Sequence, residues 1–362
     1  MRIIVSAGGT GGHLYPALAL VDYIKTQEPD AEFLFVGTTD RLESKVVPQL
    51  GYNYKGLHVK GLVGNPLQKA KNAMIFVKSL SASNKILKEF KPDIVIGFGG
   101  YPSASIVMQA SRRHIPTMIH EQNSIIGLTN KILINRVDEI ICCYEKALEA
   151  FPKEKTKLLG NPRASAVWNN DLKDVHDMYN IPKDKKVLVI VMGSLGSRSV
   201  NNIMIDAIKR MEHKDYHVLY VTGKDYYEEM KEAVGHVGDH IHLVPYIDDM
   251  PSVLSSSDVI VSRAGATTLA EMTSLGSVSI IVPSPYVVAN HQEYNAEELA
   301  NKGACVMVKE KDLNPSKLVG TIDSLMDNDV KRESLKKASK ALGKPNACAD
   351  IYKEIKALLA RR

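Results

Sequence analysis

The sequence predicts an α/β protein with two similar halves, each built on a parallel β-sheet. Short apolar runs alternate with segments of helical periodicity along the whole chain, which is the pattern of consecutive βαβ units. A strand, a glycine-rich turn and a helix open the chain, and the same order begins again near residue 186. At 362 residues the chain is long enough for two domains, each with its own core.

Composition restricts the classes of protein to which the chain can belong. Hydrophobic residues make up 44% and charged residues 24%, which is typical of soluble globular proteins. No apolar run reaches the roughly 18 residues of a membrane-spanning helix, and no leader precedes the first strand, so we expect neither a span nor a signal peptide. The net charge of +5 is too small by itself to indicate nucleic acid binding. The cysteines lack metal-ligand spacing and fit reduced thiols of a cytosolic protein: Cys142, Cys143, Cys305 and Cys348.

The apolar runs define the expected strands and domains. The predicted strands are 2–7, 32–36, 93–97, 116–120, 139–143, 186–192, 217–222, 258–262, 278–282 and 304–308. The helix- and strand-breaking residues Gly160, Asn161 and Pro162 predict a boundary between an N-terminal domain, 1–160, and a C-terminal domain, 161–346. Residues 347–362 predict a final helix, which either crosses back to the first domain or docks on its own.

The most informative segment is the turn from Gly8 to His13, which joins the first strand to the first helix. Its four glycines allow a close backbone approach and present N–H groups at a helix N-terminus, where an anion can bind. The spacing does not give the dinucleotide pattern G-x-G-x-x-G. His13 adds a titratable side chain at the mouth of this turn.

Further polar and glycine-rich clusters follow other predicted strands. They are Gly97 to Tyr101, His120 to Asn123, and Ser262 to Thr268, the last leading into a helix that carries Glu271. Open α/β sheets bind ligands beyond the carboxyl ends of their strands, so these clusters predict a binding crevice. A helix N-terminus facing a diphosphate, with Glu271 two turns along on a ribose diol, indicates a nucleotide-sugar site. A solvated Glu271 behind an ordinary threonine cap is the alternative.

The motifs GGTGGH, GFGGY, HEQN with GLTNK, GNP-R, G-S-x-G, YIDDM, SRAGATTLAE and NHQEYNA together resemble those of the MurG family, from residue 3 to about residue 300. Members transfer N-acetylglucosamine from UDP-N-acetylglucosamine to the muramyl 4-hydroxyl of undecaprenyl-pyrophosphoryl-MurNAc-pentapeptide, converting lipid I to lipid II for peptidoglycan. The resemblance implies a GT-B glycosyltransferase architecture of two Rossmann-like domains. It also implies that the donor lies mostly on the C-terminal domain, and that an inverting reaction uses neither metal nor cofactor.

The resemblance also implies roles for individual residues. His13 matches the residue proposed near the acceptor hydroxyl, as catalytic base. The acceptor side is expected at Gly99, Gly100, Tyr101, His120, Glu121 and Asn130. The donor contacts are expected at Thr10, Gly11, Gly12, Asn123, Ser194, Ile247, Ala266, Thr267, Thr268, Leu269, Ala270, Glu271 and Gln292.

Two positions depart from the family pattern. Leu195 stands where the second glycine loop usually carries glutamine, which removes one possible diphosphate donor. The usual GNPVR is shortened to Gly160–Arg163, so Arg163 is left out of the expected donor contacts.

The segment from Lys69 to Lys91 carries six lysines against one acidic residue, with apolar residues between them. A basic amphipathic stretch of this kind suits anionic lipid head groups, although the pattern by itself fits an ordinary solvated helix with a core stripe slightly better. A lipid-linked acceptor favours the first interpretation. It places the protein peripherally on the cytoplasmic face of the cell membrane.

Other classes of protein fit the sequence less well. An NAD-dependent dehydrogenase needs a G-x-G-x-x-G turn with an acid about 20 residues on, which neither glycine loop supplies. A nucleic acid binder could use the Lys69–Lys91 stretch, but the chain carries no nucleic acid motif. A UDP-sugar epimerase of the same fold and a UDP-sugar:diacylglycerol glycosyltransferase are the nearest alternatives.

Overall fold

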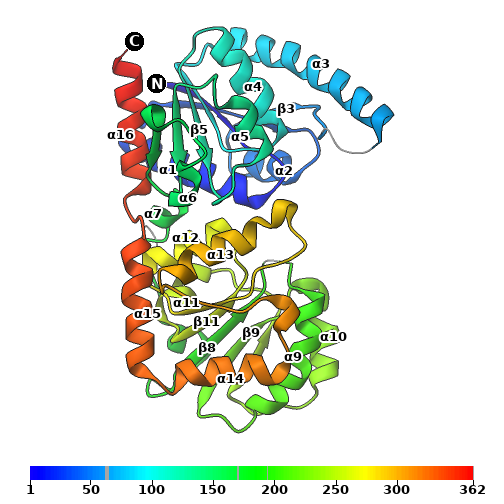
Figure 1. Ribbon diagram of the computed structural model, residues 1–362, viewed down its shortest axis with the longest axis vertical. Helices are drawn as coiled ribbons and strands as arrows, with labels where there is room; N and C mark the ends of the chain where they lie inside the picture. Colours follow the sequence, from blue (N-terminus) through cyan, green and yellow to red (C-terminus); the bar gives the residue numbers. More distant parts are fainter. Residues whose placement is uncertain (62–64, 169–170, 194, 362) are drawn as a thin grey trace. The chain divides into compact units, whose positions relative to one another are not determined.

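The computed structural model describes residues 1–361 except 62–64, 169–170 and 194. The chain forms two compact units, and the first combines Met1–Ala166 with the C-terminal segment from Asn346 (Figure 1). The second unit is Val167–Pro345. The division therefore follows Ala166, slightly beyond the expected boundary at residue 160.

The first unit contains a parallel sheet with strand order β3-β2-β1-β4-β5-β6-β7. Its strands are β1 (Arg2–Ser6), β2 (Glu32–Thr38), β3 (Asn53–Leu57), β4 (Ile94–Gly97), β5 (Thr117–Glu121), β6 (Glu139–Cys142) and β7 (Thr156–Leu158). The strand order reverses between β1 and β4, and in open α/β sheets ligands bind beyond the carboxyl ends of the strands at such a point.

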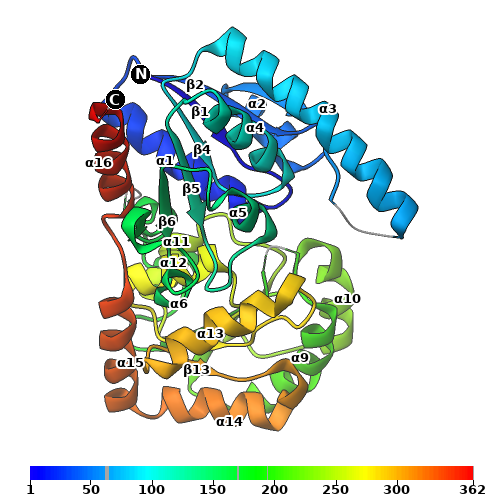
Figure 2. The same cartoon turned by 45° about the horizontal axis from the view of Figure 1, so that its top comes forward.

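Helices cover both faces of this sheet. They are α1 (Gly11–Gln27), α2 (Leu42–Gln49), α3 (Pro66–Phe90), α4 (Tyr101–Arg112), α5 (Leu128–Leu133), α6 (Glu145–Leu148), α7 (Arg163–Ala166) and α16 (Ala347–Ala360), with the short 3-10 turn η1 (Lys153–Lys155). Successive β1 residues point to opposite faces: Ile3 packs in the core with α1 and α16, and Ile4 packs in the core with α3 and α4. The final helix thus contributes Ile351 and Ile355 to the core of the first unit (Figure 2).

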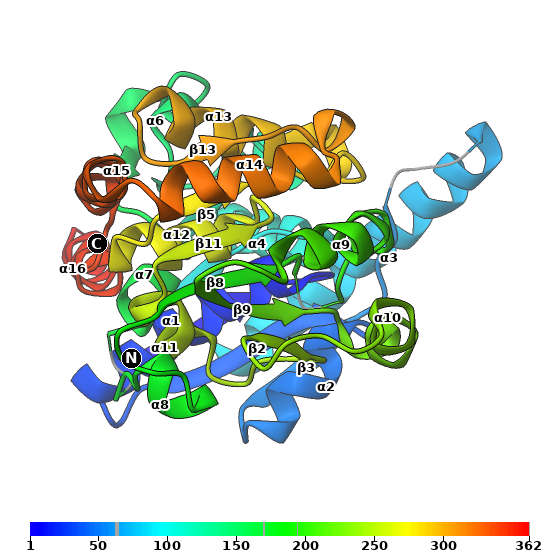
Figure 3. The same ribbon diagram turned by 90° about the horizontal axis from the view of Figure 1, so that it is seen from below.

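The second unit repeats the arrangement with strand order β10-β9-β8-β11-β12-β13. Its strands are β8 (Lys186–Val191), β9 (Tyr216–Val221), β10 (Ile241–Val244), β11 (Val259–Ser262), β12 (Ser279–Ile281) and β13 (Val306–Met307). Its helices are α8 (Val175–Tyr179), α9 (Arg198–Met211), α10 (Tyr227–Val234), α11 (Met250–Ser256), α12 (Ala266–Leu275), α13 (His291–Asn301), α14 (Pro315–Met326) and α15 (Asp329–Leu342). Three 3-10 turns join them: η2 (Lys224–Tyr226), η3 (Val288–Asn290) and η4 (Glu310–Asp312). One face of the sheet packs against α9, α10 and α14 (Figure 3).

Each strand predicted from the sequence is present. The strands that the sequence did not reveal are β3, β7 and β10, and each lies at an edge of its sheet. Edge strands pair on one side only and are partly exposed, as in the NYKGL sequence of β3, so they need no continuous apolar run. Among the described residues, no helix is both long and apolar enough to span a bilayer.

Candidate functional site

The glycine-rich turn of the first unit joins β1 to α1. Gly9 has a φ of +89°, a conformation that favours glycine, and α1 begins at Gly11. The Gly8 N–H donates to the Gly99 carbonyl at 3.2 Å, which ties this turn to the turn after β4. A Cβ added to Gly100 would lie 2.5 Å from the Gly8 oxygen, so the two turns interlock only because both are glycine-rich.

His13 lies over this junction in a defined orientation. Its Nδ1 lies 2.8 Å from the Gly8 carbonyl oxygen and 3.4 Å from Thr10 Oγ1. Because a carbonyl oxygen only accepts, Nδ1 carries the proton, and in the neutral imidazole the lone pair is on Nε2. A Cβ at Gly99 would come within 2.8 Å of Nε2, so glycine at this position leaves room for the ring.

A buried carboxylate supports the same turn, and the sequence analysis missed it. Glu43, in the first turn of α2, accepts a hydrogen bond from the Gly9 N–H at 3.1 Å. The other carboxylate oxygen accepts from the Thr38 N–H and hydroxyl at 2.9 and 2.7 Å. One of the N–H groups that the sequence analysis offered to a ligand anion is therefore used within the protein.

His120 is buried at the end of β5, with 1% of its surface exposed. Its Nε2 donates to the Gly160 carbonyl at 3.0 Å, Nδ1 accepts from Gln122 at 3.1 Å, and the ring stacks on Phe98. Burial lowers the pKa of His120 to about 4, against a weaker opposing effect of the Gly160 hydrogen bond. The neutral ring therefore shapes the turn from within the core.

Glu121 and Asn130 form a second buried group beside His120. One Glu121 oxygen accepts from the Asn123 N–H at 3.1 Å, and the other accepts from the Gly127 N–H and Asn130 Nδ2 at 2.9 Å each. Asn130 also donates to the His120 carbonyl at 3.2 Å. These contacts fix the loop that carries Asn123. Glu121 therefore holds that loop in place.

The second unit contains a cavity of about 860 Å³ at the carboxyl ends of β8 and β11. The turn after β8 lines it with Gly193, Leu195 and Gly196, and the start of α12 contributes Gly265 and Thr268. The described lining also includes Ser197, Arg198, Ser199, Asn202, Asp225, Tyr226, Ser262, Arg263, Ser284, Tyr286 and Gln292. N–H groups at the starts of α9 and α12 give this cavity the character of an anion site.

Two side chains in this cavity have defined roles. Gln292 accepts the Ser284 N–H through Oε1 at 2.9 Å, so its amide NH2 group is the end that can donate to a ligand. Arg263 is paired with Glu310 at 2.6 Å and donates to Ser197 at 2.7 Å. The Arg263–Glu310 pair therefore anchors the glycine turn, a role that the sequence did not indicate for either residue.

The remaining expected donor residues lie in different places. Ile247 is buried after β10, and Glu271 is buried on α12, where Ala266, Thr267, Leu269 and Ala270 precede it. Of the run 266–271, Thr268 lines the cavity. Thr10, Gly11, Gly12 and Asn123 belong to the first unit. Ser194 lies outside the described residues.

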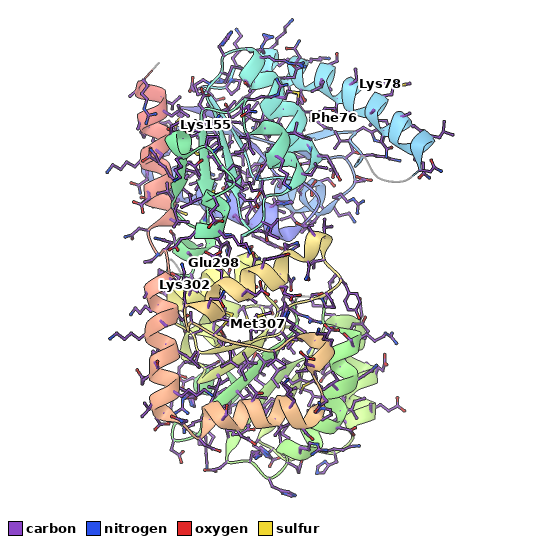
Figure 4. The ribbon with its side chains drawn as sticks, viewed as in Figure 1. Phe76, Lys78, Lys155, Glu298, Lys302 and Met307 are labelled. Carbon is purple, nitrogen blue, oxygen red and sulfur yellow. The ribbon has the colours of Figure 1, made fainter. Side chains whose placement is uncertain are left out.

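The lysine-rich helix α3 separates its side chains onto two faces. Ile86 and Leu87 pack in the core of the first unit, and the partly buried Phe76 and Leu80 pack against that core. Figure 4 shows Phe76 on the inner side of α3 and Lys78 on its outer side. Leu67, Met74 and Val77 are 81%, 63% and 64% exposed, among exposed lysines that include 71, 78, 85 and 88. The N-terminal half of α3 projects from the first unit (Figure 2).

Family models match most of the chain. The glycosyltransferase family 28 N-terminal domain matches residues 3–142, and the glycosyltransferase family 28 C-terminal domain matches residues 187–354. Together with the two parallel sheets and the anion-binding turns, these matches define the class: a two-domain glycosyltransferase of family 28.

Curated relatives narrow the class. A Bacillus cytotoxicus protein named UDP-N-acetylglucosamine--N-acetylmuramyl-(pentapeptide) pyrophosphoryl-undecaprenol N-acetylglucosamine transferase is 43% identical, and the alignment covers 100% of both chains. A Listeria monocytogenes protein of the same name is 40% identical over 99% of this chain and 100% of its own. The chain belongs to the MurG family, which confirms the resemblance inferred from the motifs.

Solved structures agree with the fold. The crystal structure of Acinetobacter baumannii MurG superposes with a TM-score of 0.80 at 25% identity, covering 98% of this chain and 99% of that chain. A Neisseria meningitidis UDP-GlcNAc 2-epimerase bound to UDP-GlcNAc gives a TM-score of 0.71 at 14% identity over 100% of both chains, a likeness of fold alone. The predicted GT-B fold class is confirmed.

Proposed function

We propose that this protein transfers N-acetylglucosamine from UDP-N-acetylglucosamine to the muramyl 4-hydroxyl of lipid-linked MurNAc-pentapeptide, giving the lipid-linked disaccharide precursor of peptidoglycan. The observation that carries the proposal is the 43% identity, over the full length of both chains, to a transferase named for this reaction. The glycine-rich turns and the cavity of the second unit supply groups of the kind that this chemistry needs.

His13 is the proposed general base. The acceptor oxygen attacks the anomeric carbon, a C–O bond forms, and the hydroxyl proton moves to Nε2. The bond from the anomeric carbon to the diphosphate breaks, and its electron pair leaves with UDP. The contact of Nδ1 with the Gly8 carbonyl supports this role, because it leaves the lone pair on Nε2. His120 and Glu121 keep the supporting loops in place through their buried contacts.

The cavity of the second unit is the proposed donor site. Helix N-termini and backbone N–H groups around it favour a diphosphate and stabilise the charge that develops as UDP leaves. The NH2 group of Gln292 is suited to a sugar hydroxyl, and the carboxylate of Glu271 is proposed for the ribose diol. Ile247 and the α12 run are further proposed donor contacts.

The exposed face of α3 is the proposed membrane contact, on the cytoplasmic surface of the cell membrane. Three exposed apolar side chains stand among exposed lysines on one helix, as expected for a segment that enters the head-group region of an anionic bilayer. Each well-placed lysine contributes about 1 kcal/mol of attraction to such a surface. This position would bring the first unit to its lipid-linked acceptor.

The transfer reaction tests the proposal directly. The protein is incubated with radiolabelled UDP-N-acetylglucosamine and lipid-linked muramyl-pentapeptide, and label is measured in the lipid phase. Incorporation that depends on the muramyl lipid supports the proposal. Incorporation into diacylglycerol instead, or epimerisation of the UDP-sugar without transfer, would replace it with one of the alternative activities.

A further inference from the structure

The carboxylate of Glu43 is buried beside the glycine-rich turn, with 1% of the residue exposed. It accepts the Gly9 N–H on one oxygen, at 3.1 Å, and the Thr38 N–H and hydroxyl on the other. All three contacts are donors, which is the arrangement that an ionised carboxylate needs when water is excluded.

The peptide group between Gly8 and Gly9 connects this carboxylate to His13. Its N–H donates to Glu43, and its carbonyl oxygen accepts from His13 Nδ1 at 2.8 Å. In a planar trans peptide the N–H and the C=O point in opposite directions, so one peptide stands between the carboxylate and the imidazole. The three groups form a continuous hydrogen-bonded chain.

A negative charge at the N–H end of an amide draws electron density toward its carbonyl oxygen. Hydrogen bonds in such chains strengthen one another in a buried environment. The Gly8 oxygen therefore becomes a better acceptor for the Nδ1 proton, and the positively charged imidazolium is stabilised relative to the neutral ring. Nε2 becomes more basic while the ring is kept in one orientation.

We propose that Glu43 is a positioning residue that orients His13 and increases its basicity through the Gly8–Gly9 peptide group. In serine hydrolases a carboxylate does this for an imidazole by direct contact, and one peptide group intervenes in the present chain. An effect of Glu43 on the reaction rests on the proposed role of His13 as the base. An effect of Glu43 on the basicity of His13 does not depend on that role.

Other groups near His13 do not reproduce this effect. His120, at the end of β5, is close enough to His13 for a charge on one ring to act on the other. Because the pKa of His120 is lowered to about 4, that ring stays neutral above pH 5 and its influence is constant there. Thr10, whose Oγ1 lies 3.4 Å from Nδ1, brings a hydroxyl rather than a charged group.

The variant Glu43→Gln removes the charge and keeps the size of the side chain. Opposite charges within 4–6 Å shift a pKa by about 1–3 units, so a charge acting across a peptide should shift that of His13 by about half a unit to one unit. We expect the pKa of His13, followed by NMR of isotope-labelled histidine, to fall by that amount. The control Thr38→Val removes the hydroxyl bond to Glu43 but keeps the Gly9 contact, so it should destabilise the protein without moving the His13 titration.

Enzyme kinetics on the same variant separate the two claims. The acidic limb of kcat/KM should move to lower pH by the same amount as the NMR titration, with the dissociation constant for UDP unchanged. If the pKa of His13 in the NMR titration shifts and the acidic limb of kcat/KM does not, Glu43 acts on His13 through the Gly8–Gly9 peptide group, which we call the peptide relay, and His13 is not the base. An unchanged NMR titration overturns the relay, whatever the rates do.

Should Glu43→Gln fail to fold, the wild-type protein still tests the relay. The Gly9 amide proton lies within the proposed chain, so its chemical shift should titrate with the same midpoint as the His13 ring. A Gly9 resonance that stays constant through that midpoint would overturn the inference.

Discussion

Lowering the pH from 7 to 5 should destabilise the first unit through His120. Burial lowers the pKa of this ring in the folded protein to about 4, from an ordinary value of 6.5. Below pH 6.5 the imidazole of His120 is protonated in the unfolded chain but not in the folded chain. The stabilisation of the folded state by the neutral ring is therefore complete above pH 6.5 and is lost as the pH falls toward 4.

The linkage relation gives the size of this effect. A pKa of 6.5 in the unfolded chain and about 4 in the folded chain corresponds to about 3 kcal/mol of stability in full, of which about 2 kcal/mol is lost between pH 7 and pH 5. The measurement is hydrogen exchange of the β5 amides, corrected for the intrinsic pH dependence, because this probe reports the first unit separately from the second.

Two variants make the test specific. In His120→Gln an amide can keep the contacts with Gly160 and Gln122 but cannot titrate, so the loss of stability between pH 7 and pH 5 should shrink by about 2 kcal/mol. His58 is exposed in the same unit, so His58→Gln should lose as much stability between pH 7 and pH 5 as the wild-type protein does. If wild-type and His120→Gln protein lose equal stability between pH 7 and pH 5, titration of the buried His120 ring is not the cause of the loss. If the reasoning holds, an acidic limb of activity above pH 5 belongs to another group.

Three further predictions concern the proposed reaction. His13→Ala should lower kcat by about 10²- to 10⁴-fold, the usual contribution of a general base, and abolish the acidic limb of the pH–rate profile, with little change in donor affinity; a loss under about tenfold would place the base elsewhere. Glu271→Ala should weaken UDP binding and raise the KM for the donor, and unchanged affinity in calorimetry would remove Glu271 from the ribose site. Replacing Lys78, Lys85 and Lys88 with Glu should reduce binding to anionic liposomes, most strongly at low salt, because exposed charges are screened within about 10 Å at 0.1 M. Activity on a short-chain acceptor should survive in that variant, and equal loss on both acceptors would indicate misfolding instead.

The sequence by itself determined the architecture of this protein and the glycine-rich turns that we propose for its chemistry. Strands β1, β4 and β8 are buried on both faces, so they appear as continuous apolar runs that need no tertiary information. The Gly8–His13 and Gly97–Tyr101 turns are also local, because backbone approach and positive φ at Gly9 and Gly99 demand glycine. These local signals, with the motifs that resemble the MurG family, were sufficient to assign the family.

Only the tertiary structure decided what individual polar side chains do. His120 and Glu121 are the last residues of β5, and the fold buries both and uses their polar atoms in contacts that hold loops. Glu43 shows no signal in the sequence, because its contact with Gly9 depends on where α2 lies. On α3 the apolar residues between the lysines look alike in the sequence, and the tertiary fold decided that Leu80 is partly buried against the core while Met74 is exposed. Burial and hydrogen-bond partners depend on elements that are distant in the chain, and a residue's sequence neighbours cannot specify them.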